Sequence, residues 1–328
     1  MTPRAIAIVL CACLPLGGCE WQQSILAPGG PHAASVATLS WVMFIGAGLI
    51  FVLVMALTAL ASLAEADRAS WLSHKAVIIG GGVIFPIVTL TALLAYGLLL
   101  SRNLVAAGPP ALRIEVVGEQ FWWRVHYLDS SGARHLVTAN EIRIPVGLTI
   151  EFILQSKDVI HSFWVPSLAG KLDMIPGRVN SYRFAAERPG TYRGQCAEYC
   201  GAQHALMAFY VVAMDRNEFD AWYARQSEPA PDPAGAFPAR GKTLFLENGC
   251  GACHTIRGTP AEGKIGPDLS HIGSRVSLAA GTFPNNQGTL AGWISSAQHL
   301  KPGNLMPSFG NLSGQDLRAM AAYLEGLR

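Results

Sequence analysis

The sequence is poor in charged residues. Asp, Glu, Lys and Arg make up only 14% of its 328 residues, whereas soluble domains usually have about 25%. The mean hydropathy of +0.30 is high for a chain dissolved in water. The net charge is only +2 and no basic run carries interleaved aromatic residues, so the sequence argues against nucleic-acid binding. It contains no internal repeat, and its length suits two or three domains.

The spacing of the cysteines does not predict a disulfide framework. Three of the seven lie in the first twenty residues, and the other four form two close pairs, Cys196 with Cys200 and Cys250 with Cys253. Close pairs of this kind are typical of ligand or attachment sites.

The N-terminal residues predict a secreted start. Residues 1–18 hold one early positive charge and an apolar run that is too short to span a bilayer, as in a secretory signal peptide. The run ends in Leu-Gly-Gly-Cys, which resembles a bacterial lipobox and implies cleavage before Cys19 and lipidation of its thiol. The alternative is an ordinary signal peptide whose small residues suit a peptidase.

Two long apolar runs, at 39–64 and 76–100, predict a hairpin of transmembrane helices over residues 35–103. Each run exceeds the roughly 20 apolar residues that a spanning helix needs. No Lys or Arg lies between residues 20 and 40, whereas the connector between the runs carries Arg68 and Lys75. This bias puts the connector in the bacterial cytoplasm and everything after the second helix on the periplasmic or extracellular side of the plasma membrane.

Short strands are predicted in residues 110–226. The pattern is rich in Val, Ile, Phe, Tyr and Thr and is bounded by Gly, Pro and Asp. Five or more such strands in a segment of this length predict a β-sandwich. A stretch rich in Pro and Ala at 227–238 predicts a linker, and residues 239–328 form a further domain.

The stretch GQCAEYCGAQHALM gathers thiol, imidazole and thioether groups in one loop. Together these ligands favour copper. Two thiolates held four residues apart can bridge two metal ions, and each ion then needs one terminal imidazole. The expected ligands are Cys196, Cys200, His204, a second histidine best supplied by His161, and, as weak outer ligands, Met207 and the backbone carbonyl of Glu198.

Two alternatives compete with copper at this loop. The two cysteines with His204 and His161 could form a tetrahedral zinc site, although zinc would leave Met207 without a role. Cys196 and Cys200 could also form a disulfide in an oxidising compartment.

Two membrane helices followed by this loop resemble subunit II of the haem-copper cytochrome c oxidases. The stretches SLAGKLDMIPGRVN and GEQFWWRV belong to the same pattern. The resemblance implies a binuclear copper centre, CuA, on a cupredoxin fold, and a magnesium ion at the interface with subunit I that the Glu198 side chain approaches. The sequence departs from the family at Phe121, because a tryptophan usually stands there and receives electrons from cytochrome c. Trp122 and Trp123 follow it as further candidates for electron transfer.

The second cysteine pair belongs to CGACH, the attachment motif for c-type haem. Cys250 and Cys253 would form thioethers with the haem, and His254 would bind the iron. The loop GPDL at 266–269 resembles the one whose proline carbonyl accepts a hydrogen bond from the haem histidine, which orients the ring. Residues 239–328 thus resemble a class I cytochrome c.

A methionine is the expected sixth ligand, because methionine raises the potential of the haem. Met306 lies in a loop and is preferred over Met320, which falls in a helical segment that begins with the cap Ser313. His271 and His299 are the remaining candidates.

The whole pattern predicts a multidomain protein: a transmembrane helix hairpin, a cupredoxin β-sandwich and an all-α cytochrome c domain. It resembles the caa-type oxidases, in which subunit II carries its own cytochrome. This implies that cytochrome c or a bc complex supplies electrons to the haem, and that CuA passes them to subunit I, where oxygen is reduced and protons are transported. Subunit III is a further implied partner. The alternative is the corresponding subunit of a CuA-type nitric oxide reductase.

Overall fold

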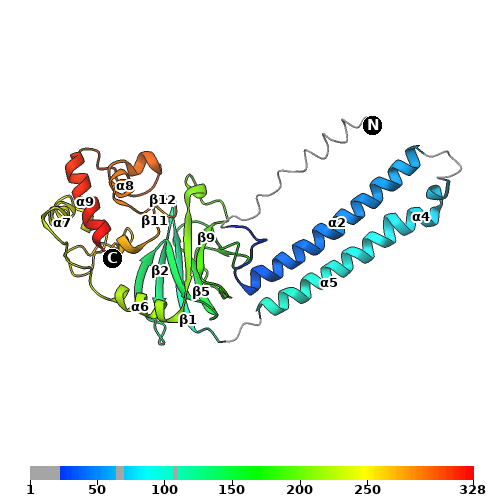
Figure 1. Cartoon of the computed structure of the whole chain (residues 1–328), viewed down its shortest axis with the longest axis horizontal. Helices are drawn as coiled ribbons and strands as arrows, with labels where there is room; N and C mark the ends of the chain where they lie inside the picture. Colours follow the sequence, from blue (N-terminus) through cyan, green and yellow to red (C-terminus); the bar gives the residue numbers. More distant parts are fainter. Residues whose placement is uncertain (1–22, 64–69, 106–108) are drawn as a thin grey trace. The chain divides into compact units, whose positions relative to one another are not determined.

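The computed structural model describes residues 23–63, 70–105 and 109–328. It divides into a helical unit, residues 34–108, and a larger unit that joins the residues up to Ala33 with residues 109–328 (Figure 1). The expected signal peptide, Cys19 and Arg68 lie outside the described residues.

Two long apolar helices make up the helical unit. Helix α2 covers Pro31–Leu63, and α4 (Lys75–Ile79), the π-helical turn η2 (Gly80–Ile84) and α5 (Phe85–Val105) form one run after the short helix η1 (Ser70–Ser73). Pro31 opens α2 at the first helical position, where proline costs no hydrogen bond. Both runs are long and apolar enough to cross a membrane, and their apolar side chains are exposed. The expected pair of spans is therefore confirmed as a pair of helices.

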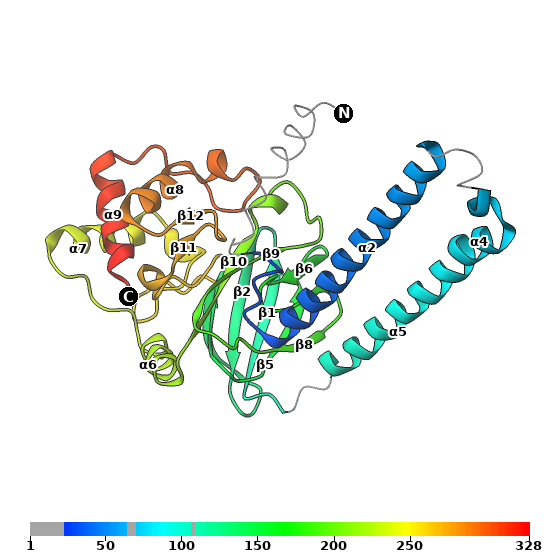
Figure 2. The ribbon, with the colours of Figure 1, turned by 45° about the vertical axis from the view of Figure 1, so that its right-hand side comes forward.

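Ten strands form two mixed sheets in the larger unit (Figures 1 and 2). The first sheet has the order β3-β2-β1-β5-β8 and the second has the order β4-β10-β9-β6-β7. Strands β1 and β5 pair in parallel, as do β4 and β10, and the other neighbours are antiparallel. The strands are β1 (Leu112–Glu119), β2 (Trp122–Leu128), β3 (Arg134–Ala139), β4 (Glu141–Pro145), β5 (Ile150–Ser156), β6 (His161–Trp164), β7 (Lys171–Met174), β8 (Asn180–Phe184), β9 (Gly190–Cys196) and β10 (Ala208–Met214).

The core of the sandwich is aromatic. Alternate residues of each strand face the opposite sheet, so Trp123, Phe163 and Phe209 meet there with ring centroids 4.7–6.0 Å apart. Gly194 on β9 leaves the room that the ring of Phe209 fills, because a Cβ at this glycine would lie 2.3 Å from Phe209 Cζ. This packed core fixes the ends of β6, β9 and β10.

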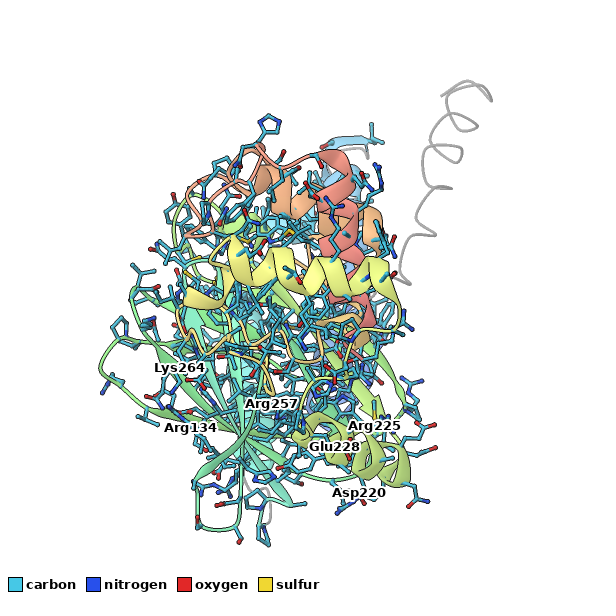
Figure 3. All side chains as sticks on the ribbon, turned by 90° about the vertical axis from the view of Figure 1, so that its left-hand side faces the viewer. Arg134, Asp220, Arg225, Glu228, Arg257 and Lys264 are labelled. Atoms are coloured by element: carbon cyan, nitrogen blue, oxygen red, sulfur yellow. The ribbon has the colours of Figure 1, made fainter. Side chains whose placement is uncertain are left out.

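Helix α6 (Arg216–Ser227) ends the sandwich and was not predicted. It buries Trp222 against Tyr127, with ring centroids 5.5 Å apart. After it, the chain reaches the last domain, where Arg257 donates to the carbonyl of Gln226 and the ring of His271 lies 3.1 Å from the carbonyl of Glu228. Figure 3 marks Arg257 and Glu228 at this junction.

The C-terminal domain is helical. It contains α7 (Ala236–Glu247), η4 (Cys250–Ala252), η5 (Ile272–Ser274), β11 (Ser277–Leu278), β12 (Phe283–Pro284), α8 (Gln287–Leu300) and α9 (Gly314–Gly326). Ser313 caps α9 as expected, because its hydroxyl accepts from the backbone N–H of Asp316. Helix α7 begins at Ala236, inside the stretch expected as a linker. Pro238 does not prevent this start, because it falls in the first turn of the helix, where proline is tolerated. The expected architecture of helices, sandwich and helical domain is confirmed.

Candidate metal and haem sites

The sulfur-rich loop lies between β9 and β10. Cys196 ends β9, Cys200 follows in the loop, His204 opens the turn η3 (His204–Leu206), and Met207 precedes β10. The two sulfurs, Cys196 Sγ and Cys200 Sγ, lie 3.8 Å apart. A disulfide needs about 2.05 Å, so the pair is free and the disulfide alternative is wrong for this structure.

His161 joins the loop from another strand. Since β6 pairs with β9, His161 at the start of β6 lies beside the cysteine at the end of β9, with its Nδ1 3.7 Å from Cys196 Sγ. Its Nε2 lies 2.8 Å from Asp158 Oδ1, which orients the ring. Gly118 on β1 makes room for this ring, because a Cβ there would lie 2.7 Å from His161 Cδ2.

The remaining donor atoms converge on the same two sulfurs. His204 Nδ1 lies 3.6 Å and Met207 Sδ 3.8 Å from Cys200 Sγ, and the carbonyl oxygen of Glu198 lies 3.1 Å from Cys196 Sγ. Six donors from three side-chain types and one carbonyl exceed the four that a structural zinc site uses. The set fits copper, and the donor atoms of His161 and both cysteines lie within 4.8 Å of one another.

The close contact of the two cysteines shifts their pKa values in opposite directions. The contact between the two sulfurs lowers the pKa of Cys196 and raises the pKa of Cys200. Burial lowers the pKa of His161, but its hydrogen bonds to Cys196 and Asp158 outweigh burial and raise that pKa overall. The side chains of the loop are therefore coupled to one another through direct contacts.

The carboxylate of Glu198 points to a different group from its carbonyl. Glu198 Oε2 lies 3.3 Å from Lys171 Nζ, and Lys171 Nζ also lies 3.8 Å from Asp173 Oδ1. All three side chains are about half exposed.

The CGACH motif opens a cavity of about 230 Å³. Cys250, Cys253 and His254 line it. His254 Nδ1 lies 2.8 Å from the carbonyl oxygen of Pro267, which confirms the expected contact with this proline. Gly266 is needed beside the ring, because a Cβ there would lie 2.6 Å from His254 Cε1. Burial lowers the pKa of His254 and so favours the neutral imidazole, the form that binds a metal.

Two methionines reach the same cavity, Met306 and Met320. Met320 is 1% exposed within α9 and packs in the domain core. Met306 lies in a loop whose backbone is fixed, since its N–H donates to Asn304 Oδ1 at 2.7 Å and its carbonyl accepts from Gln298 Nε2 at 2.7 Å. The other two candidates lie elsewhere: His271 contacts the carbonyl of Glu228, and His299 is exposed near the end of α8. The two thiols, the neutral imidazole and the loop methionine fit a haem.

The three consecutive aromatic residues Phe121, Trp122 and Trp123 lie in two different places. Trp123 lies in the sandwich core, whereas Phe121 and Trp122 line the haem cavity. The Phe121 ring is also next to the sulfur-rich loop, since a Cβ on Gly201 would lie 3.2 Å from Phe121 Cε1. Phe121 therefore stands between the cavity and the residue that follows Cys200.

Sequence reasoning missed the residues that join the two sites. Gln120 Nε2 donates to the carbonyl of Cys200 at 2.6 Å, Gln203 Nε2 donates to the carbonyl of Pro302 at 2.8 Å, and Lys301 Nζ donates to the carbonyl of Phe121 at 2.9 Å. No local pattern marks these residues, because each contacts a segment about 80 or more positions away.

Comparisons with known proteins agree with this division. Residues 115–214 match the family of the periplasmic domain of cytochrome c oxidase subunit II, and residues 238–328 match the cytochrome c family. Cytochrome c oxidase subunit 2 of Alkalihalophilus pseudofirmus is 39% identical over 221 residues, 67% of this chain and 63% of the relative. The subunit 2 of Bacillus sp. strain PS3 is 30% identical over 225 residues, 66% of this chain and 62% of the relative.

A solved structure is also similar to part of this chain. The periplasmic domain of subunit II of cytochrome oxidase from Bradyrhizobium japonicum is 30% identical and covers 36% of this chain and 94% of that domain, with a TM-score of 0.34. The chain spans a little under two thirds of the length of the two curated relatives. It belongs, by residues 115–214, to the family of the periplasmic domain of cytochrome c oxidase subunit II, and it carries a cytochrome c domain at residues 238–328.

Proposed function

We propose that this chain is the electron-accepting subunit of a cytochrome c oxidase. An external donor, cytochrome c or a bc complex, reduces a covalent haem c, and a binuclear CuA centre carries the electron on to the haem-copper site of subunit I, where oxygen is reduced to water with proton transport. The observation that carries the proposal is the convergence of six copper-type donor atoms beside a second cavity built around CGACH.

Each site has a defined set of residues in this proposal. Cys250 and Cys253 hold the haem through thioethers, and His254 and Met306 bind its iron. The residues that hold the two copper ions are His161, Cys196, Glu198 through its carbonyl, Cys200, His204 and Met207. Bound haem and copper each supply a one-electron carrier. Pro267 keeps the His254 ring oriented by accepting from Nδ1, which leaves Nε2 free for a metal.

The position of Phe121 supports direct transfer between the two centres. Its ring lies against Gly201 of the copper loop and also lines the haem cavity. A tryptophan that captures electrons from a soluble cytochrome is less important when the donor haem is held at this surface by its own chain. Phe121 and Trp122 are thus the proposed residues between haem and copper.

The proposal places the protein in the bacterial plasma membrane. The two apolar helices fit membrane spans, and the metal sites then lie on the periplasmic or extracellular side. Lipidation at Cys19, a contact with subunit III, and a magnesium ion held at the subunit I interface by Glu198 belong to the same proposal. Lys171 lies 3.3 Å from one carboxylate oxygen of Glu198.

Metal and haem content of the full-length chain, purified in detergent, tests the proposal. We expect two coppers and one covalent haem per chain, with EPR hyperfine lines spread over two equivalent copper nuclei. Cys200→Ser should abolish the EPR hyperfine pattern of two equivalent coppers and leave the haem. Replacement of both Cys250 and Cys253 by Ala should remove the haem and leave the copper. One copper or a zinc ion in the wild type would contradict the proposal.

The activity of the complex that this chain forms with its partner subunit distinguishes the oxidase from the nitric oxide reductase alternative. The purified complex that contains this chain should consume oxygen with a reduced cytochrome as donor. A complex that consumes nitric oxide but not oxygen would favour the alternative.

A further inference from the structure

A single turn connects the two proposed metal loops. It runs from Lys301 to Met306, after α8, and its far end carries the methionine that faces the haem cavity. Its near end contacts the copper loop at two points, since Lys301 Nζ donates to the carbonyl of Leu206 and the carbonyl of Pro302 accepts from Gln203 Nε2. Leu206 directly precedes Met207, and Gln203 directly precedes His204.

Lys301 is buried and fully bonded at this contact. The residue is 3% exposed. Its ammonium group donates to the carbonyl oxygens of Phe121 at 2.9 Å, Leu206 at 2.9 Å and Ala279 at 3.1 Å. An ammonium group has three donors, so the three carbonyls use all of them. Two of these carbonyls belong to the copper domain and one belongs to the haem domain.

Burying the charged group of a lysine at this position costs the folded state free energy. Burial lowers the pKa of Lys301 to about 7, and the nearby Cys200 side chain acts in the opposite direction. Removing the ammonium would leave three buried carbonyls without this donor, and each would lose its hydrogen bond without regaining water. An apolar residue could fill the same space but could not bond these carbonyls, so the ammonium group is what ties the three segments together.

The rest of the turn transmits this anchor to the haem side. Asn304 Nδ2 donates to the carbonyl of Lys301 at 2.6 Å and to that of Ala297 at 3.0 Å, and Asn304 Oδ1 accepts from the N–H of Met306. Lys301 and Met306 are therefore held in one rigid piece. On the opposite side, the N–H of Ala208 donates to the carbonyl of Ala280 at 2.9 Å, which closes the same interface.

We propose that Lys301 is a positioning residue for electron transfer: its ammonium group ties the haem-ligand turn to the carbonyls of Phe121 and Leu206 and so fixes the approach of the haem to the copper loop. This inference rests on the proposed function, because it assumes that both cofactors are bound.

The first test is the rate of electron transfer within the chain. The haem of the full-length protein is reduced with a photogenerated one-electron reductant, and reduction of the copper is followed by absorption. We expect Lys301→Met to slow this step roughly tenfold to a hundredfold, as for other small misplacements of reacting groups. Lys301→Arg keeps a charge and several donors and should restore part of the rate. Lys264→Met, the same change at an exposed lysine of the haem domain, should have no effect.

The second test needs neither cofactor to react. In copper-free protein, amide hydrogen exchange is compared for peptides that cover 203–210 and 277–283. Lys301→Met should increase exchange in both, because the Ala208 to Ala280 hydrogen bond opens when the turn is released, and Lys264→Met should leave both unchanged. Copper content and the EPR spectrum of the copper-loaded variant should match the wild type.

The outcomes separate the inference from the function on which it rests. An unchanged transfer rate in Lys301→Met, or unchanged exchange, would overturn the positioning role, as would loss of the copper spectrum, which would make Lys301 a support of the copper loop only. A wild-type chain without two coppers would instead contradict the proposed function, and the exchange experiment would still decide the role of Lys301. If Lys301→Met does not accumulate, Lys301→Gln retains a donor and takes its place in both tests.

Discussion

His126 shows how a single buried side chain makes stability depend on pH. It lies on β2 at 6% exposure, and among the described residues neither ring nitrogen has a hydrogen-bond partner. Burial, followed by the nearby Arg134 guanidinium, lowers the pKa of His126 from 6.5 to about 4. The folded sandwich therefore holds a neutral imidazole, whereas the unfolded chain takes up a proton below pH 6.5.

The pH dependence follows from this difference. Because the unfolded state binds more protons between pH 6.5 and 4, the wild type should lose up to about 3 kcal/mol of stability across that window. His126→Gln should lack this part of the loss, and His135→Gln, at an exposed position on β3, should retain it. Urea unfolding of the three proteins at pH 7 and pH 4.5 measures the difference. Equal losses in wild type and His126→Gln would contradict the assignment.

The two methionines of the haem cavity can be distinguished by replacement. Met306→Leu removes the proposed sixth ligand, so the reduction potential of the haem should fall. Met320→Leu changes only the packing of α9, so the potential should stay the same and stability should change by less than about 1.5 kcal/mol. Spectroelectrochemical titration of both variants decides between them. A fall in potential with Met320→Leu alone would assign the ligand to the helix.

At the scale of elements, the haem domain depends on the close approach of α7 and α9. Gly241 of α7 lies against the backbone of α9, where a Cβ would stand 2.0 Å from the carbonyl oxygen of Ala319 and 2.9 Å from Tyr323 Cβ. The obstacle at Ala319 is backbone and cannot rotate away. An alanine would therefore push the two helices apart.

Gly241→Ala should destabilise the haem domain by roughly 1–3 kcal/mol, the cost of overpacking a tight contact. Gly292→Ala in α8 is the matched control, since a Cβ there meets nothing within 4 Å. It should stabilise the helix by about 0.5–1 kcal/mol, because alanine loses less backbone entropy than glycine. Thermal melting followed at the haem absorption band compares the two. A stable Gly241→Ala would mean that α7 and α9 can move apart freely.

How much of the site could be predicted from the sequence depended on how far apart along the chain the residues lie. Five of the six proposed copper ligands lie in one loop, so spacing alone could indicate them, and His161 could be suggested because a strand end often carries a ligand. The strand pairing that brings His161 to Cys196 needed the structure. Helix α6 was missed because its apolar residues are few, and it gains its stability from Trp222 packing on Tyr127.

At the scale of the larger unit, the two domains are joined by more than their linker. Glu141 Oε2 accepts from the N–H of Val276 at 2.7 Å, Arg143 donates to the carbonyl of Ser274 at 2.8 Å, and Arg124 donates to the carbonyl of Lys264 at 3.0 Å. Each bond pairs a charged side chain of the sandwich with a backbone group of the haem domain. Such charge-assisted bonds are about twice as strong as neutral ones.

These bonds predict that the two domains stay together when the linker is cut. A protease site is inserted after Pro233, in the stretch between α6 and α7, and the purified chain is cleaved. We expect the haem fragment to remain with the membrane-bound sandwich fragment during size-exclusion chromatography. Glu141→Ala should release more of it, because Val276 loses its acceptor and Arg143 loses the carboxylate that lies 2.8 Å from its Nε. Exchange of the exposed ion pair Arg216–Asp220 for two alanines, away from the haem domain, should release none. If the haem fragment separates from the sandwich fragment after cleavage of a chain without these substitutions, the linker alone holds the domain in place.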